Sequence, residues 1–268
     1  MSEERVVNRT IRPLTRTLLA QHLRKLGLKE GMTIIVHSSM SALGWVCGGP
    51  VAVIQALQDV LTPRGTLIMP AHTANVSDPK EWGEPAIPES WWKEVREEMP
   101  PFDPDVTPTY FMGQIAESFR TMPDVRRSNH PRYSFAAWGK HRDFIVENHS
   151  LDYGMGENSP LGKVLECDGS VLLLGTGYEN NTSMHLGEHM SDCYGSLTKG
   201  SPMLEESNRV WKTFKDLDYN DETFMTIGKA FEECHPVKVE PIGNANVRLM
   251  RQADIVHFTA SYIQEHKL

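Results

Sequence analysis

Few cysteines and no long apolar or basic runs are found in this sequence of 268 residues. The four cysteines, Cys47, Cys167, Cys193 and Cys234, include no C-x-x-C pair, which argues against a thiolate zinc site and a disulfide framework. No apolar stretch approaches the roughly 20 residues of a membrane span. The N-terminal segment lacks the apolar core of a signal peptide. These absences predict a reduced, cytoplasmic protein without a membrane partner.

Basic charge is also scarce, with 27 Lys and Arg against 35 Asp and Glu and a formal net charge of −8. A nucleic-acid protein needs a basic stripe to neutralise phosphates, so we expect no nucleic-acid partner. An acidic surface attracts cationic ligands, but the same charge also simply keeps a protein soluble. The hydrophobic content of 40% excludes a disordered chain.

Three motifs of nucleotide binding and covalent catalysis are missing. The sequence contains no G-x-x-x-x-G-K-[ST], no G-x-G-x-x-G and no G-x-S-x-G, which are the patterns of the P-loop, the dinucleotide fold and the nucleophile elbow. A covalent nucleophile is therefore not indicated. The most economical chemistry is direct transfer, in which a base removes a proton from the incoming nucleophile.

Short apolar runs alternate with amphipathic segments, which is typical of an α/β fold. The patterns predict helices over Thr15–Leu26 and Pro50–Leu61 and buried strands over Thr33–Val36, Thr66–Met69 and Ser170–Gly175. With no linker or repeat in view, we expect one domain over residues 1–268, a mixed sheet flanked by helices.

Three further segments have patterns of their own. The Pro- and Trp-rich stretch Pro70–Pro108 is either a functional loop or a structural flap. Arg209–Tyr219 resembles a hairpin, and a final helix is expected over Asp254–His266.

The first candidate site follows the strand Thr33–Val36. His37, Ser38, Ser39 and Ser41 lead to Gly49 at the start of a helix. Free N–H groups and the helix dipole make such a loop suitable for an anion such as phosphate. An ordinary loop with serine caps, and a buried core histidine at position 37, explain the pattern equally well.

The second candidate is the segment His185-Leu-Gly-Glu188-His189. In a helix, His185 and Glu188 share one face, and a carboxylate beside an imidazole suits general-base catalysis. The same letters spell H-x-x-E-H, in which His185 and His189 would bind zinc. Gly187 within the motif argues against the long regular helix of such zinc enzymes, but a zinc hydrolase stays open as an alternative.

The third candidate is the turn before a strand expected over Ser134–Trp138. It places His130 and Ser134 at a loop–strand edge, a common position for site residues. A purely structural turn explains the pattern as well.

Together these segments resemble the aminoglycoside 3-N-acetyltransferase family, whose fold is unrelated to that of the GNAT superfamily. The resemblance extends from about residue 10 to 265. The matching segments are Val36–Gly44, Gly48–Pro50, Gly65–Pro70, Ser77–Pro79, Ser128–Pro131, Ser134–Gly139, Ser159–Gly162 and Gly175–Gly177 leading to Asn181–Glu188.

The resemblance implies an α/β fold peculiar to that family and acetyl transfer from acetyl-coenzyme A to the 3-amino group of 2-deoxystreptamine antibiotics, without a metal. It implies His185 and Glu188 as the catalytic pair. It assigns cofactor or substrate contacts to two groups of residues, the loop and helix residues His37, Ser38, Ser39, Ser41 and Gly49, and the more distant Thr73, His130 and Ser134.

Some expectations attached to the resemblance stay open. The substrate is an aminoglycoside or another amine, and a homodimer is compatible with the sequence. Acids in the expected loops suit a polycationic antibiotic, although such acids usually form only a solvated face. They are Asp78, Glu81, Glu84, Asp152 and Glu157.

Overall fold

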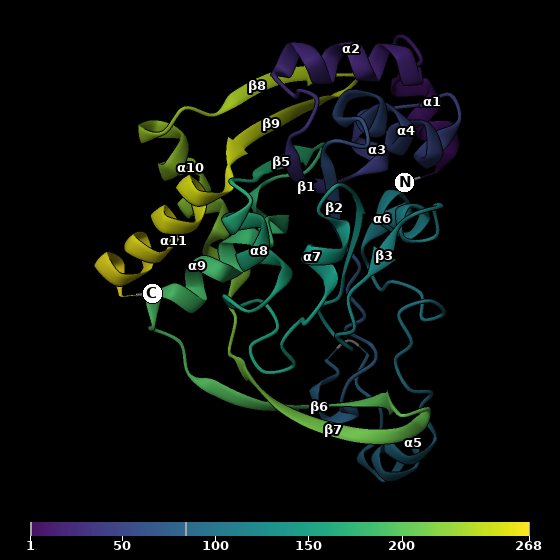
Figure 1. The fold of residues 1–268 in the computed structure, drawn as a ribbon, viewed down its shortest axis with the longest axis vertical. Coiled ribbons are helices and arrows are strands. Elements are labelled where there is room, and N and C mark those ends of the chain that lie inside the picture. The colour runs from purple at the N-terminus through teal and green to yellow at the C-terminus, as the bar shows by residue number, and fades with distance from the viewer. Residues whose placement is uncertain (1, 84, 268) are drawn as a thin grey trace.

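The computed structural model describes residues 2–83 and 85–267 and shows a mixed sheet of seven strands in the order β3-β4-β2-β1-β5-β9-β8 (Figure 1). The three central strands, β2, β1 and β5, are parallel. The outer strands pair antiparallel on both sides. The strands of this sheet are β1 Thr33–Ser38, β2 Thr66–Pro70, β3 Arg126–Arg127, β4 Phe135–Gly139, β5 Ser170–Leu174, β8 Lys238–Ile242 and β9 Ala245–Arg251.

Helices cover both faces of the sheet because the central strands are apolar on both sides. In β1, Ile34 and Val36 face one cluster of buried side chains, and Ile35 faces the other. The first cluster lies under α2 Arg16–Leu26, α4 Gly49–Leu61 and α6 Gly113–Arg120. The second lies under α7 Arg142–Val146, α8 Pro160–Glu166, α9 Ser183–Ser191, α10 Phe224–Cys234 and α11 Gln252–His266.

A long hairpin and a Pro-rich flap form a separate part of the molecule at one end (Figure 1). The hairpin consists of β6 Ser196–Glu205 and β7 Asn208–Leu217. The flap, residues 70–108, contains α5 Trp92–Glu98 and a bridge between Phe102 and Met203 of the hairpin. The remaining helices are α1 Glu3–Arg9, α3 Met40–Leu43 and the short 3₁₀ turns η1 Pro79–Glu81, η2 Glu89–Trp91, η3 Tyr178–Asn180 and η4 Asp221–Thr223.

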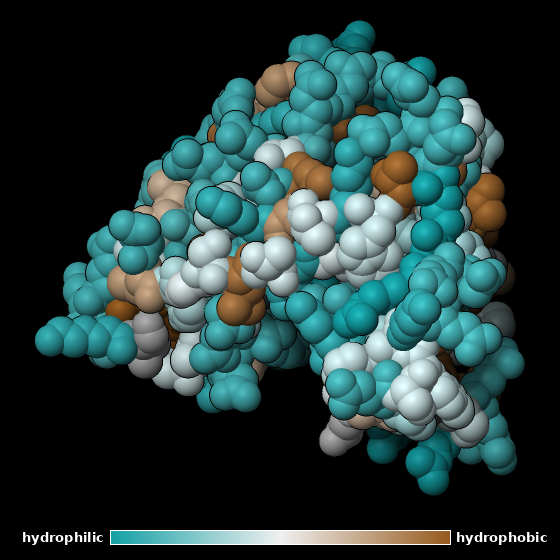
Figure 2. All heavy atoms as spheres, turned by 90° about the horizontal axis from the view of Figure 1, so that it is seen from below, coloured by the Kyte–Doolittle hydropathy of each residue, from teal (hydrophilic) through white to brown (hydrophobic). Residues whose placement is uncertain are grey.

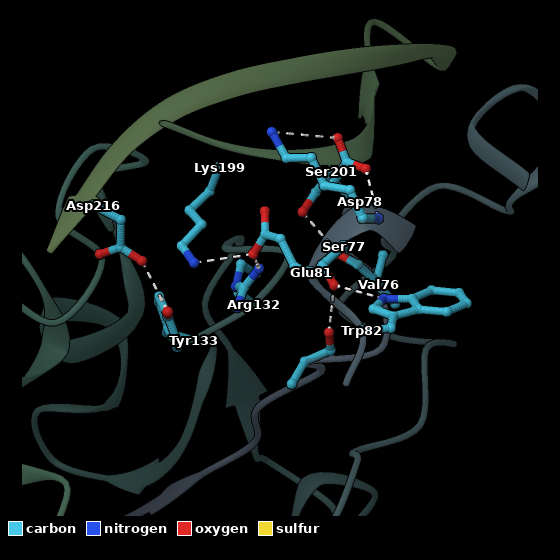
Figure 3. A network of polar contacts seen from close by, with 12 residues as sticks. Val76, Ser77, Asp78, Glu81, Trp82, Arg132, Tyr133, Lys199, Ser201 and Asp216 are labelled. Carbon is cyan, nitrogen blue, oxygen red and sulfur yellow. Dashed lines mark hydrogen bonds and ion pairs between the residues drawn. The ribbon is translucent and has the colours of Figure 1, made fainter. Parts of the chain in front are cut away.

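Ion pairs fasten the flap to the hairpin and to the loop before β4 (Figure 3). Glu81 Oε2 lies 2.6 Å from Arg132 Nη1 and 3.0 Å from Lys199 Nζ. The three side chains are only 15%, 12% and 17% exposed. Beside them, the Tyr133 hydroxyl donates to the buried Asp216 at 2.8 Å. The flap is therefore an integral part of the fold, held from two directions.

The predicted mixed sheet flanked by helices is confirmed. The helix expected from Thr15 begins at Arg16, because Thr15 is its N-cap and accepts a hydrogen bond from the Leu18 N–H. The hairpin expected within Arg209–Tyr219 was wrong, since most of this segment is the single strand β7 and its partner is β6. The sequence analysis missed α1, α10, β8 and β9. The two strands form a hairpin with each other, and only β9 makes a long-range antiparallel pair, with β5.

Candidate functional site

Three histidines meet at the carboxyl ends of the parallel strands. His37 lies at the end of β1, His72 follows β2, and His185 lies in α9, which follows β5. Because parallel strands end at the same edge of a sheet, residues that follow them gather there. All three histidines line one cleft of about 1410 Å³. This edge of the sheet is the candidate active site.

His185 and Glu188 interact within α9. His185 Nδ1 and Glu188 Oε2 form a short hydrogen bond, and the other carboxylate oxygen accepts the Asn220 N–H at 2.8 Å. Glu188 is fully buried, whereas His185 is 16% exposed. The rings of Tyr219 and Phe224 pack against the imidazole with centroids 4.9 and 4.8 Å away. The imidazole is therefore held in one orientation by the carboxylate and two aromatic rings.

The second ring nitrogen of His185, Nε2, remains available to the cleft. His185 Nε2 makes no hydrogen bond within residues 2–83 and 85–267, while Nδ1 is occupied by Glu188. When Nδ1 carries the proton and donates it to a carboxylate, Nε2 is an acceptor. The geometry thus offers a proton acceptor to a molecule bound in the cleft.

Gly187 allows α9 to lie close to α11. A Cβ atom at this position would lie 2.7 Å from Thr259 Cβ and 2.7 Å from the Val256 carbonyl oxygen. The Gly187 that argued against a zinc helix is therefore explained by packing. Because His185 and Glu188 flank this contact, the position of both side chains depends on it.

We expect Gly187→Ala to lower the free energy of unfolding by about 1–3 kcal/mol, because overpacking at a close contact displaces the backbone. Turnover should fall as well, since α9 moves away from the cleft. Urea denaturation and a steady-state assay check both effects. The matched control is Gly195→Ala, where a Cβ would meet no atom of the described chain within 4 Å. Equal stability of the two variants would contradict the packing argument.

His37 and His72 are neutral histidines in the wall of the cleft. The pKa of His37 is lowered to about 3, mainly by burial and secondly by the nearby His185. The same two causes, in the same order, hold the pKa of His72 well below its ordinary value. The Nε2 atoms of both rings are buried without a hydrogen-bond partner in the described part of the chain.

The serine-rich loop lies along the cleft as the sequence predicted. Ser38, Ser39, Ser41 and Gly49 all contribute to its lining. Gly48 and Gly49 have φ of 86° and 59°, a left-handed conformation that glycine adopts without strain, and they turn the chain into α4. The loop and the N-terminus of α4 are therefore the part of the cleft best suited to phosphate groups. Arg9 and Arg248 add positive charge to the lining.

Three other predicted site residues do not reach the cleft. Thr73, His130 and Ser134 are buried and are not among the residues that line it in the described chain. The hydroxyl of Thr73 donates to the Pro131 carbonyl, and that of Ser134 to the Ala71 carbonyl at 2.7 Å. His130 Nδ1 accepts the N–H groups that follow it at Arg132 and Tyr133. These side chains stabilise the loop before β4 instead.

The sequence analysis missed several residues of the cleft. His72, the neighbour of Thr73, follows the end of a buried strand, and His37 lies at the end of another. A histidine at a strand end was the signal that could have identified His72. Asn181 was treated only as a helix cap. No pattern in the sequence indicated the lining residues of α1, which has no buried side chain. The missed lining residues include Glu3, Arg9, His72, Phe111, Tyr133, Met155, Asn181, Asp221 and Arg248.

The loop acids are not arranged as the sequence analysis expected. Asp78 pairs with Arg96 at 2.7 Å, and Glu81 pairs with Arg132 and Lys199. Asp152 accepts the Lys215 N–H, Glu157 is exposed, and Glu84 lies outside the described residues. Within the described chain, the acids that line the cleft are Glu3, Glu179 and Asp221. Asp78 and Glu81 therefore stabilise the flap and do not line the cleft.

The zinc alternative lacks a ligand set. In the part of the chain that the structure describes, no group of three or more His, Cys, Asp or Glu side chains is placed to hold a metal ion. His189 packs against Tyr153 with ring centroids 5.5 Å apart and does not line the cleft.

Seen from the hairpin end, the surface is mostly hydrophilic, with hydrophobic residues scattered among polar ones (Figure 2). Of the helices described, none combines the length and the apolar character of a membrane span.

Comparison with known proteins identifies relatives along almost the whole chain. A family model described as aminoglycoside 3-N-acetyltransferase matches residues 35–264. The chain is 47% identical to the SPbeta prophage-derived aminoglycoside N(3')-acetyltransferase-like protein YokD of Bacillus subtilis (strain 168), over 97% of this chain and 96% of that protein. It is 34% identical to aminoglycoside N(3)-acetyltransferase VII of Streptomyces paromomycinus, over 99% of this chain and 96% of that protein.

Solved structures show the same fold. The crystal structure of YokD from Bacillus subtilis has a TM-score of 0.97 and 46% identity, and covers 98% of both chains. The binary structure of AAC-IIIb with CoASH has a TM-score of 0.86 and 30% identity, over 95% of this chain and 98% of that one. AAC-VIa bound to sisomicin has a TM-score of 0.84 and 28% identity, over 95% of this chain and 99% of that one.

Proposed function

The chain belongs to the aminoglycoside 3-N-acetyltransferase family, and from that premise we propose that it transfers the acetyl group of acetyl-coenzyme A to the 3-amino group of 2-deoxystreptamine aminoglycosides. Relatives with the same fold have been seen with CoASH in one case and with sisomicin in another, which supports both substrates. Acetyl-coenzyme A is a cosubstrate here and the antibiotic is the acceptor.

One observation is the main support for the proposal. The imidazole of His185 faces the cleft with Nε2 free, while Nδ1 is bound to the fully buried Glu188. The carboxylate fixes the tautomer and stabilises the imidazolium that forms when Nε2 takes a proton. This arrangement is that of a general base, and an amine acceptor must lose a proton to become acylated.

The reaction follows from this placement. His185 Nε2 accepts a proton from the 3-amino group as the amine nitrogen attacks the thioester carbon. The new C–N bond forms while the carbonyl electron pair moves onto oxygen. When this pair re-forms the carbonyl, the C–S bond breaks, and the proton held by His185 is available to the thiolate of coenzyme A. Every atom is accounted for without a covalent enzyme intermediate.

The cosubstrate fits the other half of the cleft. Coenzyme A is polyanionic, and the serine loop, the N-terminus of α4, Arg9 and Arg248 line one continuous surface. Backbone N–H groups at a helix start and arginine side chains are both good phosphate ligands. We assign phosphate contacts to this surface, with His37 and Ser38 at its inner end.

A thiol-release assay tests the proposed function. Purified protein is incubated with acetyl-coenzyme A and sisomicin, and released coenzyme A is followed with a thiol reagent. Sisomicin that has already been acetylated at the 3-amino group serves as the control acceptor, and it should give no release above background. Binding of coenzyme A without turnover of any 2-deoxystreptamine antibiotic would instead favour the alternative of a different amine substrate.

Glu188→Gln should lower turnover about 10²-fold, at the low end of the usual contribution of general-base catalysis. The amide can still accept the Asn220 N–H, so the fold is preserved, but it no longer stabilises a positive charge on His185. The measurement is kcat with saturating acetyl-coenzyme A. An unchanged kcat would reduce Glu188 to a structural residue of α9.

A further inference from the structure

An unpartnered amide lies in the wall of the cleft one turn before the general base. Asn181 lies between η3 and α9, is fully buried and lines the cleft. Its Nδ2 atom has no hydrogen-bond partner in the described chain. Leaving a buried donor unsatisfied is unfavourable, so such an atom beside a cleft points to a hydrogen bond made with a bound molecule.

The orientation of this amide is fixed by the helix that follows it. Asn181 Oδ1 accepts the Ser183 N–H at 3.3 Å, as an N-terminal helix cap does. The part of the amide without a partner is therefore its NH₂ group, which can only donate a hydrogen bond. Its partner must be an acceptor, such as a carbonyl oxygen or an oxyanion.

The position of Asn181 selects the acceptor. Local backbone hydrogen bonds, from Met184 N to Asn181 O and from His185 N to Thr182 O, join the amide to the first turn of α9. An amine within reach of His185 Nε2 must also touch the thioester carbon that it attacks, with reacting atoms about 3–3.5 Å apart. The thioester carbonyl oxygen is bonded to that same carbon, and Asn181 lines the same cleft four residues before His185.

Ser39, His37 and His72 are weaker candidates for this donor. The Ser39 N–H, at the cleft end of β1, donates to the Leu174 carbonyl at 3.0 Å. His37 and His72 offer ring nitrogens whose donor or acceptor character depends on the tautomer. Asn181 is a donor in every protonation state of the site, which is what the stabilisation of an oxyanion requires.

We propose that Asn181 Nδ2 donates a hydrogen bond to the acetyl carbonyl oxygen of acetyl-coenzyme A and stabilises the negative charge that develops there. The inference rests on the proposed function for its acceptor substrate, but the contact itself involves only the cosubstrate. As the amine attacks, the carbonyl electron pair moves onto the oxygen that Asn181 binds. The bond strengthens as this charge grows and weakens when the C–S bond breaks.

Asn181→Asp is the sharpest test, because aspartate keeps the helix cap at Ser183 but replaces the donor by an acceptor. We expect kcat to fall about 10²–10³-fold, the usual effect of removing one oxyanion donor. Calorimetry should show free coenzyme A binding within about two-fold of wild type, because it has no acetyl carbonyl. Acetyl-coenzyme A should bind at least about five-fold more weakly.

The control is Asn208→Asp, which makes the same charge change at the exposed start of β7. It should keep wild-type kcat and affinities. An unchanged kcat and an unchanged acetyl-coenzyme A affinity of Asn181→Asp would overturn the inference, as would an equal loss of affinity for both forms of coenzyme A. If the wild type acetylates no aminoglycoside, the proposed function fails, and the two affinities still decide the role of Asn181.

Discussion

Replacing His185 by alanine is expected to lower turnover about 10²–10⁴-fold while coenzyme A still binds. Loss of the imidazole removes the proposed proton acceptor for the 3-amino group, and general-base catalysis typically contributes that factor. The serine loop, to which we assign the phosphate contacts, belongs to β1, α3 and α4 and not to α9, so affinity for the cosubstrate should not change. The measurement is thiol release beside calorimetry with coenzyme A. Near-normal turnover would remove His185 from the mechanism.

His189→Gln is the matched control. Its histidine lies on the same helix, one turn after His185, but packs against Tyr153 and does not line the cleft in the described chain. We expect it to retain turnover close to that of the wild type. A loss as large as that of His185→Ala, together with zinc in the purified protein, would instead favour the zinc alternative.

Acid should destabilise the protein strongly below about pH 6.5. Burial holds the pKa of His37 and of His149 at about 3, and that of the neighbouring His130 well below its ordinary value. In the unfolded chain a histidine has a pKa of about 6.5. Between these values the unfolded state binds more protons than the native state, so stability rises with pH and is lost as pH falls.

Each such histidine changes the free energy of unfolding by up to about 1.4 kcal/mol per pH unit. His149 is the best one to remove, because it lies outside the cleft lining of the described chain and its ring nitrogens contact the Ser128 hydroxyl and the Gly154 carbonyl. Urea denaturation of His149→Gln between pH 4 and 7 should show a shallower pH dependence than the wild type. Identical slopes would show that the pKa of His149 is the same in the native and unfolded states.

Local patterns in the sequence predicted the centre of the fold. β1, β2 and β5 are short runs of β-branched and aliphatic residues, and the helical spacing of His185 and Glu188 placed them on one face of α9. The hairpin of β8 and β9 was missed, and its place in the sheet is set only by the pairing of β9 with β5. The pairing of Glu81 with Arg132 and Lys199 joins three distant segments and was equally invisible.

The site residues show a finer limit of sequence reasoning. After β2 the sequence analysis selected Thr73, whereas its neighbour His72 faces the cleft. Side chains in extended segments alternate between the two faces, so an error of one residue exchanges a cleft residue for a core residue. The sequence correctly indicated where the strand ends. Which side chain then faces the cleft is set by packing against the loop before β4, where Thr73 donates to the Pro131 carbonyl.

The placement of β8 has a consequence for how the chain reaches its native state. Glu240 of β8 accepts a hydrogen bond from Lys25 of α2 at 2.8 Å, so an edge of the sheet joins segments more than two hundred positions apart. Non-local pairings of this kind slow folding. During synthesis, the free edge of β5 remains without its antiparallel neighbour until β9 emerges from the ribosome. Nascent chains should therefore depend on chaperones at that stage, because an unpaired strand edge invites association with other chains.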